Sequence, residues 1–282
     1  MPKHASRLVV YTAVLGDEQP LREQPVADVS TSDFVCFTDD PRLGSDTWET
    51  VLVQPRVAAD PVRSARFLKI VGHPALAGYD RSLWVDNAVE LRKPPELFVG
   101  DWLADAHVAA PQHTLYATVA AEAQAAIDLG KDDHLRVFEQ LAHYLDTTPG
   151  ALEARQHWTG LLARRGSHTA TTAMTLWWEH VLRYSSRDQL SFGVAMTAAG
   201  VWVRSVPLAN LQSAVHAWPS GPDTRADADA DAHARTARVR AEIEEVLSDV
   251  HDRDEWILEL ESRLTAATDK VRQLRTHLSD GA

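Results

Sequence analysis

The sequence predicts an α/β protein with a nucleotide-binding sheet, followed by a C-terminal coiled-coil helix. Three observations lead to this prediction. In the N-terminal part, short apolar runs alternate with turns and a helix, and each run ends in an acid or a glycine. Within residues 82–91 (SLWVDNAVEL), the pattern of a buried strand stops abruptly at Asp86. From Ile243 onward, apolar residues recur every seven positions.

The first half of the chain contains the patterns of buried strands. Residues 8–15 form a continuous β-branched and aromatic run, which is typical of a central strand. Pro61 marks the start of a helix. We expect strands at 8–15, 34–38, 48–54 and 83–85, and a helix at 62–71.

After Pro94-Pro95 the sequence becomes mostly helical. The amphipathic pattern of 132–145 predicts a helix whose core-facing residues are Leu135, Phe138, Leu141 and Leu145. We expect further helices at 96–103, 118–129, 173–184 and 192–199, and strands at 161–165 and 201–206.

The composition changes at Gly221. Residues 221–238 are rich in Asp and Ala and are interpreted as a solvated linker. Residues 239–282 carry about five heptads with charged flanks, which predicts a coiled coil that joins subunits or binds a partner. The alternative is an amphipathic helix folded back onto the globular domain, which would comprise residues 1–220. The repeating core positions are Ile243, Val250, Ile257, Leu264, Val271 and Leu278.

Composition also limits the compartment and the partners. The net charge of −12 excludes an electrostatic basis for binding nucleic acid. The single cysteine, Cys36, cannot form an intrachain disulfide, which favours a reducing compartment. No apolar run is long enough to span a bilayer. We therefore expect a cytoplasmic protein, with any association at a membrane made through partners.

The position of Asp86 makes it the first candidate for chemistry. A carboxylate that follows a parallel strand lies at the edge where α/β sheets bind ligands. It can hold a divalent cation that also grips a phosphate, or it can simply cap a turn. Upstream, Arg63, Arg66 and Lys69 recur every three residues on the predicted helix. They form either a solvated face or a cationic grip on a diphosphate.

A second candidate region is 175–192 (TLWWEHVLRYSSRDQLSF). Its aromatic pair is either core or a surface for stacking sugar rings. At the start of the next helix, Asp188 and Gln189 could position hydroxyl groups, and Asp188 is the candidate general base. The predicted acceptor site comprises Trp177, Trp178, Glu179 and Arg187.

The order of these motifs resembles one family. The succession VVYTAVLGD, DFVCFTDDP, DPVRSARFLKIVGHPAL, YDRSLWVDNAVEL and WWEHVLRYSSRDQLSF is similar to a glycosyltransferase-like domain. That domain occurs in plant proteins of turgor regulation and seed-mucilage synthesis and in bacterial polysaccharide proteins. The resemblance covers about residues 8–206.

The resemblance implies a GT-A fold, with a Rossmann-like mixed sheet and flanking helices, and a nucleotide-diphosphate sugar donor with Mn²⁺ or Mg²⁺. It implies that the acid of the metal motif is Asp86, although that motif reads Asp86-Asn87-Ala88 without a second acid at its usual place. His216 lies where many GT-A enzymes have a histidine ligand. Donor-binding roles are implied for Thr12, Ala13, Asp39, Arg66 and Lys69, and contact with the donor sugar or acceptor for Asp188 and Gln189.

Taken together, the sequence predicts a glycosyltransferase that moves a sugar from a nucleotide-diphosphate donor to a glycan or polysaccharide-precursor acceptor. Two alternatives stay open. The first is a sugar nucleotidyltransferase, although no glycine-rich signature loop appears near the first strand. The second is a catalytically degenerate module that binds nucleotide sugars and acts through its coiled coil.

Overall fold

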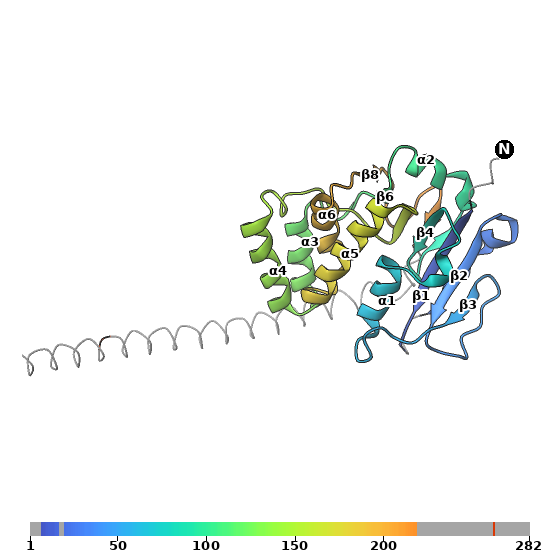
Figure 1. Ribbon diagram of the computed structural model, residues 1–282, viewed down its shortest axis with the longest axis horizontal. Helices are drawn as coiled ribbons and strands as arrows, with labels where there is room; N and C mark the ends of the chain where they lie inside the picture. The colour runs from blue at the N-terminus through green and yellow to red at the C-terminus, as the bar shows by residue number, and fades with distance from the viewer. Residues whose placement is uncertain (1–6, 17–19, 219–261, 263–282) are drawn as a thin grey trace, which may run out of the picture. The chain divides into compact units, whose positions relative to one another are not determined.

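The computed structural model describes residues 7–16, 20–218 and Ser262, and the fold below is that of the first two ranges (Figure 1). The predicted linker and coiled coil, 221–238 and 239–282, lie outside the described residues apart from Ser262. The strands are β1 (Leu8–Val14), β2 (Asp33–Thr38), β3 (Glu49–Leu52), β4 (Arg81–Val85), β5 (Glu90–Leu91), β6 (Val108–Pro111), β7 (Leu161–Arg165), β8 (Val203–Val206) and β9 (His216–Ala217).

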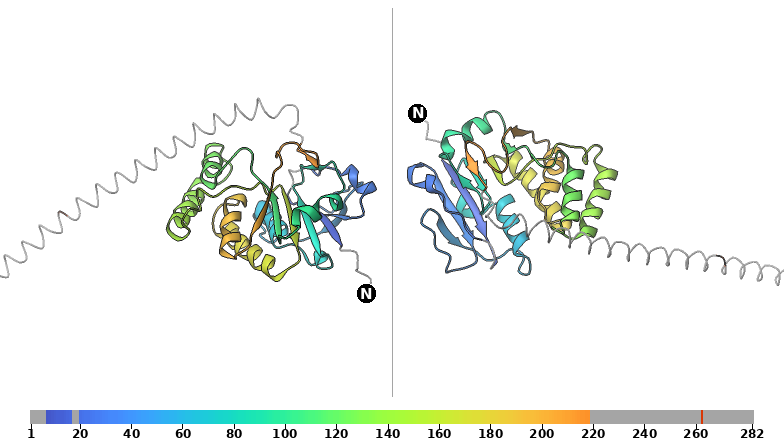
Figure 2. Two further views of the ribbon diagram at one scale, coloured as in Figure 1. Left: turned by 90° about the horizontal axis from the view of Figure 1, so that it is seen from above. Right: turned by 180° about the vertical axis from the view of Figure 1, so that it is seen from behind.

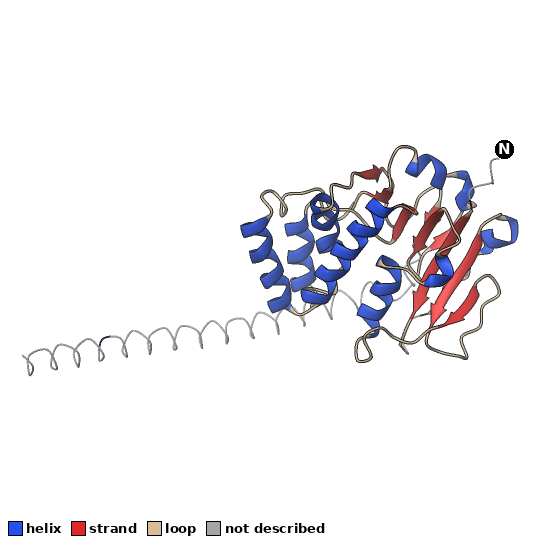
Figure 3. Ribbon diagram, in the orientation of Figure 1, coloured by secondary structure: helices blue, strands red, loops and turns tan. Residues whose placement is uncertain are grey.

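Six α-helices and three short 3₁₀ turns accompany the strands in these two ranges (Figure 3). None of these helices is long and apolar enough to cross a lipid bilayer. The α-helices are α1 (Pro61–Ile70), α2 (Val99–Leu103), α3 (Val119–Asp128), α4 (His134–Thr147), α5 (His168–Arg183) and α6 (Gln189–Ala198). The 3₁₀ turns are η1 (Pro25–Val29), η2 (Pro74–Leu76) and η3 (Pro95–Leu97).

The main sheet is mixed and has the order β3-β2-β1-β4-β7-β6-β8, while β5 and β9 form a separate antiparallel pair. Strands β1 to β4 are parallel, so their carboxyl ends share one edge of the sheet. Strand β7 runs the other way and therefore begins at this edge, where Leu161 pairs with Val85. The α/β mixed sheet that the sequence predicts is confirmed.

Strand β1 is buried on both faces, which explains its uninterrupted apolar run. Val9 and Tyr11 point into the core beneath α1 and α5. Leu8 and Val10 point into the other core, beneath α2. Because successive side chains of a strand alternate between faces, a run without polar residues requires a layer on each side.

Helices α3 to α6 gather at one end of the sheet (Figures 1 and 2). Helix α5 packs against α1 and α6, and α3 packs against α4 and α6. Helix α5 begins earlier than the sequence suggests because Ser167 caps it, with its hydroxyl accepting from Ala170 N at 3.2 Å. The predicted helix at 96–103 is split into η3 and α2.

The predicted core face of α4 is wrong for three of its four residues. Leu135, Phe138 and Leu145 are exposed and Leu141 is half-buried, while the buried face carries Val137 and Tyr144. Tyr144 is fixed there by its hydroxyl, which is 2.7 Å from His180 Nδ1 on α5. The helix has apolar residues on more than one side, so their spacing alone cannot show which side meets the neighbouring helices.

Candidate functional site

Asp86 lies at the carboxyl edge of β4, as the sequence predicts. Its backbone N–H donates to Gly160 O at 2.9 Å, which ties the end of β4 to the residue before β7. Its Oδ1 accepts a hydrogen bond from Trp84 Nε1 at 2.6 Å. The N–H of Val89 donates to Asp86 O at 2.8 Å and closes the turn that leads into β5. The carboxylate is therefore held at a fixed place on the sheet edge.

The Lys69 ammonium is the centre of the charged site. Its side chain is only 1% exposed, and Nζ lies 2.7 Å from Asp188 Oδ2 and 3.7 Å from Asp86 Oδ1. Nζ also donates to Thr159 Oγ1 at 2.9 Å. A buried ammonium requires such partners because it has lost its hydration. Side chains from α1, from the end of β4 and from the segments before β7 and α6 thus meet at a single buried cation.

Arg66 completes the cluster on the same side. Its Nε lies 3.1 Å from Asp188 Oδ1, so both oxygens of Asp188 face cations. Burial alone would raise the pKa of Asp188. The charges of Arg66 and Lys69, with hydrogen bonds from Lys69 and Thr159, outweigh burial and hold that pKa well below its usual range. Asp188 is consequently a permanent anion at neutral pH.

A buried acid on α3 holds the loop that carries Asp188. The Glu122 carboxylate accepts hydrogen bonds from Gln156 Nε2 at 2.7 Å, from Arg187 Nη2 at 3.0 Å and from Gln189 Nε2. Gln189 Oε1 in turn accepts from the N–H of Thr159 at 3.2 Å. Gln189 and Arg187 therefore brace the loop in this structure, and Gln189 is buried.

A second acid, in the turn before α4, fixes the same loop. Asp132 Oδ2 accepts from the hydroxyls of Ser185 and Ser186 at 2.6 and 2.9 Å, and from Arg187 N at 3.2 Å. Burial would raise the pKa of Asp132, but the hydrogen bonds from the serines and the backbone lower it overall. Two carboxylates thus hold the segment between α5 and α6 in one conformation.

Neither ring nitrogen of His216 is free to join Asp86 as a metal ligand in this structure. His216 is fully buried, with Nδ1 2.8 Å from Ser213 Oγ and Nε2 2.9 Å from Asn210 O, so both ring nitrogens are in use. Across the described ranges, no three His, Cys, Asp or Glu side chains come together as metal ligands. The chemistry of the donor set therefore leaves Asp86 as a single carboxylate ligand.

Three of the predicted donor-binding residues take no part in the ion pairs of the charged cluster. Thr12 and Ala13 are buried near the carboxyl end of β1, directly after Tyr11, which pairs with Trp84 of β4. Arg63 ties α1 to α5, donating to Val181 O at 3.0 Å and to Tyr184 O at 2.7 Å. Asp39 does lie at the carboxyl edge, where Oδ1 accepts from Gly16 N at 3.1 Å.

The predicted aromatic acceptor surface is part of the core. Trp177 is fully buried, and its Nε1 donates to Asp188 O at 2.7 Å. Trp178 is buried against Phe67, with ring centroids 5.2 Å apart. Neither ring presents a face to a sugar in this structure. Glu179, on the same helix, is exposed.

Sequence reasoning missed Thr159, Gly160 and Glu122. Thr159 bridges Lys69 and Asp188, because its hydroxyl accepts from the former and donates to the latter, each at 2.9 Å. The signal in the sequence was the small-residue pair Thr159-Gly160 directly before an apolar strand. For Glu122, the signal was an acid in the first turn of an alanine-rich helix.

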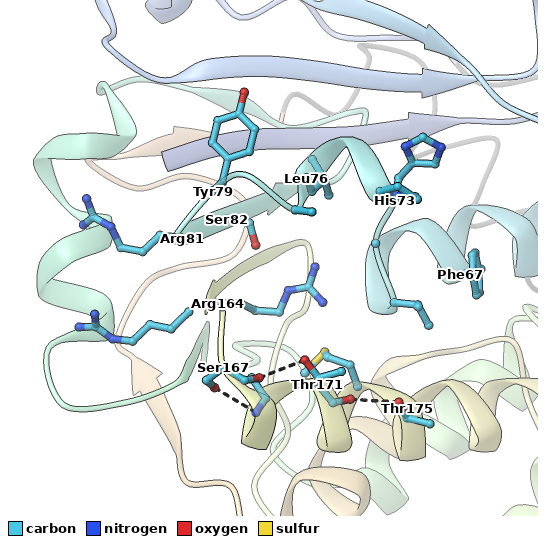
Figure 4. A pocket seen from close by; sticks show the side chains of 18 residues that line it. Phe67, His73, Leu76, Tyr79, Arg81, Ser82, Arg164, Ser167, Thr171 and Thr175 are labelled. Carbon is cyan, nitrogen blue, oxygen red and sulfur yellow. Dashed lines mark hydrogen bonds between the residues drawn. The ribbon is translucent and has the colours of Figure 1, made fainter. Parts of the chain in front are cut away.

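A cavity of about 590 Å³ lies at the opposite edge of the sheet (Figure 4). It is bounded by the start of β4, the end of β7, the end of α1 and the first turns of α5. Arg164 in its wall donates to Ile70 O at the C-terminus of α1, and Arg165 donates to Ala104 O after α2 at 3.0 Å. Both arginines complement helix ends. This cavity is separated from Asp86 by the length of β4.

The chain matches one known protein family. The family model described as TOD1/MUCI70, glycosyltransferase-like domain, matches residues 26–204, which is more than half of the chain. No curated protein shows significant sequence similarity to the chain.

Three solved structures show a distant likeness. Mouse xyloside xylosyltransferase 1 in its apo form has a TM-score of 0.38 at 11% identity, covering 71% of this chain and 84% of that one. Core-mannan synthase A from Aspergillus fumigatus, in a Mn/GDP form, has a TM-score of 0.39 at 8% identity, covering 70% of this chain and 71% of that one. The galactosyltransferase LgtC, with donor and acceptor sugar analogs, has a TM-score of 0.37 at 10% identity, covering 83% of this chain and 95% of that one.

Proposed function

Because the chain belongs to the TOD1/MUCI70 glycosyltransferase-like domain family, we propose that it transfers a sugar from a nucleotide-diphosphate donor to a glycan or polysaccharide-precursor acceptor. The observation that carries the proposal is the cluster of Arg66, Lys69, Asp86 and Asp188 at the carboxyl edge of the sheet. This edge is where α/β sheets of this kind bind their ligands.

Arg66 is the proposed contact for the diphosphate. Its side chain is partly exposed, whereas that of Lys69 is covered, so Arg66 is the cation of this pair that a ligand can reach. The planar guanidinium suits the paired oxygens of a phosphate. Lys69 acts from beneath, where its charge holds the two carboxylates and adds a positive field for the leaving nucleotide.

The charge balance of the cluster favours a divalent cation that arrives with the diphosphate. Two positive and two negative side chains already compensate each other, so the phosphates add uncompensated negative charge. Asp86 is the proposed protein ligand, since Mg²⁺ in such sites uses one or two carboxylates together with the phosphates of the substrate. Bound Mn²⁺ or Mg²⁺ would neutralise charge that develops on the leaving nucleotide.

Asp188 is proposed as a positioning residue rather than a general base. A general base works best when its pKa lies near the operating pH. The pKa of Asp188 is held well below its usual range, and both of its oxygens already face partners. Its role is to fix Arg66 and Lys69 for the donor.

One observation favours a second candidate, a module that binds nucleotide sugars without transferring them. The four charged side chains are already paired with one another, and Asp86 is a single carboxylate rather than part of a metal cluster in the described ranges. Such a module would bind a nucleotide sugar but leave its glycosidic bond intact.

A thermal-shift panel tests the donor site. The probes are UDP, GDP, CDP and ADP, each with Mn²⁺ or with EDTA. A nucleotide at about 100 times its dissociation constant should stabilise the protein by about 2.7 kcal/mol. We expect a shift with one nucleotide that is larger with Mn²⁺ and is lost in Asp86→Asn.

Asp105→Asn is the matched control, because Asp105 is an exposed acid before β6, at the opposite edge of the sheet. It should keep the shift of the wild type. Absence of a shift with every nucleotide would contradict both candidates. The binding module would be favoured if a nucleotide gives a thermal shift but the protein releases no free nucleotide from any of the corresponding nucleotide sugars, even with oligosaccharides present.

A further inference from the structure

An aromatic stack at the carboxyl edge of the sheet has one partly exposed ring. Trp218 is 37% exposed, and its ring is stacked on Trp158 with centroids 5.5 Å apart and planes 25° from parallel. Trp158 is in turn stacked on His216, at 5.2 Å and 28°. Trp158 and His216 are buried, so the exposed surface of the stack belongs to Trp218.

Two chain segments place this stack beside Asp86. On one side, β9 pairs with β5 through Ala217 and Glu90, so Trp218 continues the antiparallel register toward the turn that Asp86 begins. On the other side, Trp158 is followed by Thr159 and Gly160. The first of these bonds Lys69, and the second accepts the N–H of Asp86.

The stack is rigid before any ligand arrives. A Cβ at position 160 would overlap the Trp158 ring, so the ring can occupy this position only because residue 160 is glycine. The N–H of Trp218 donates to Leu211 O at 2.7 Å. His216 is held through both ring nitrogens. A preformed aromatic surface loses little conformational entropy when a ligand binds.

Deepening the proposed function, on which this step rests, we infer that the exposed face of Trp218 is a stacking platform for a pyranose ring of the acceptor glycan. A pyranose has an apolar face of C–H groups and a rim of hydroxyls, which suits an indole that is partly exposed to water. Pockets for small ligands likewise combine aromatic surface with a few polar groups.

The two faces of the sheet separate this platform from the donor cations. Lys69 and Arg66 extend from α1, which covers the face that includes Tyr11. Trp158 belongs to the core on the other face. Asp86 lies between the two groups, so a donor phosphate on the cationic side leaves the platform to the acceptor.

The experiment compares Trp218→Ala with Trp202→Ala. Trp202 is 59% exposed but precedes β8, whose first residue pairs with Val108 at the opposite edge of the sheet, so it is a matched control. The probes are soluble cello-, manno- and galacto-oligosaccharides, measured by titration calorimetry on the full chain. We expect at least one series to bind the wild type and Trp202→Ala equally. Trp218→Ala should bind it about tenfold more weakly, which corresponds to about 1.4 kcal/mol.

Trp218→Phe keeps a smaller aromatic face and should retain part of the affinity, which separates stacking from a loss of folding. The nucleotide-induced thermal shift is measured on the same variants and should not change. Equal oligosaccharide binding by Trp218→Ala and the wild type, or no binding by the wild type, would overturn the platform.

Loss of the nucleotide shift in Trp218→Ala alone would assign the ring to the donor and overturn its acceptor role. The proposed function would be contradicted independently of the platform if no nucleotide stabilises the wild type or any variant. Oligosaccharide binding that still depends on Trp218 would in that case leave the platform standing as a sugar site.

Discussion

At the carboxyl edge of the sheet, the Lys69 ammonium has given up its water and depends on the oxygens around it. Asp188 is equally dependent, because the side chain is buried and faces Lys69 and Arg66. Removing one member of a buried ion pair leaves the other charge uncompensated, which costs about 3–5 kcal/mol. Lys69→Met should therefore lower the free energy of unfolding by about that amount in urea denaturation.

A double-mutant cycle tests the cause of this loss. In Lys69→Met with Asp188→Asn, the orphaned carboxylate is gone, so the double variant should lose clearly less than the sum of the two single variants. Strict additivity would show that Lys69 does not stabilise the fold through Asp188.

The protonation of His157 affects the stability of the whole domain at acid pH. Burial, with a smaller effect of Arg155, lowers its pKa to about 4. As the pH falls below about 6.5, the unfolded chain takes up a proton that the folded protein does not accept until about pH 4. The neutral His157 ring therefore makes its full contribution to the free energy of unfolding above about pH 6.5. This contribution is lost as the pH falls from about 6.5 to about 4.

The variant His157→Gln keeps a group that can bond Ser205 Oγ, which is 2.8 Å from His157 Nε2. Over this window its free energy of unfolding should decline less than that of the wild type, measured by urea denaturation at a series of pH values. Other histidines with a lowered pKa, His113 among them, contribute to both curves, so the difference between the curves is the readout. Parallel curves would contradict the prediction.

At the scale of elements, Glu122 joins α3 to the segment between α5 and α6. Glu122→Gln replaces one acceptor oxygen with an amide that faces the donors of Arg187 and Gln189. Lost hydrogen bonds and an unpaired charge should destabilise the domain by about 2–4 kcal/mol. Hydrogen exchange should rise first in residues 185–189, because Glu122 holds this segment.

Glu179→Gln is the control for this change, since Glu179 is an exposed acid on α5. It should leave both the stability and the exchange of residues 185–189 as they are in the wild type. A uniform rise in exchange across the domain in Glu122→Gln would mean that Glu122 stabilises the fold globally rather than this segment.

Elements also differ in how well their sequences report their surroundings. Strand β1 has one possible interpretation, because an unbroken apolar run must be covered on both faces. Helix α4 has several, since Leu135 and Phe138 on one side compete with Val137 and Tyr144 on another. Only the packing against neighbouring helices shows which side is buried.

At the scale of the whole molecule, the heptad segment 239–282 stays a prediction, because it lies outside the described residues apart from Ser262. Deleting the residues after Gly221 should lower the oligomeric state in sedimentation experiments while the thermal unfolding of the remaining domain stays cooperative. The reason is that a coiled coil buries its apolar seam only against another helix. A full-length protein that sediments as a monomer would contradict the coiled coil.

The sequence by itself determined the α/β class, six of the seven strands of the main sheet and the position of Asp86, whereas β6 was missed. These follow from local patterns: a buried strand needs a continuous apolar run, and its end is marked by the first acid. It also placed Arg66, Lys69 and Asp188 among the candidates, which the structure brings to one cluster.

Only the tertiary structure decided which candidates share a site. Lys69 and Asp188 are far apart in sequence, yet their charges compensate each other, while Trp177 and Trp178 turn out to be core and Trp218 is accessible. The periodicity of apolar residues shows on which side of its own helix or strand a side chain lies. Burial and charge pairing depend on neighbouring elements that arrive from distant parts of the chain, and no local pattern records them.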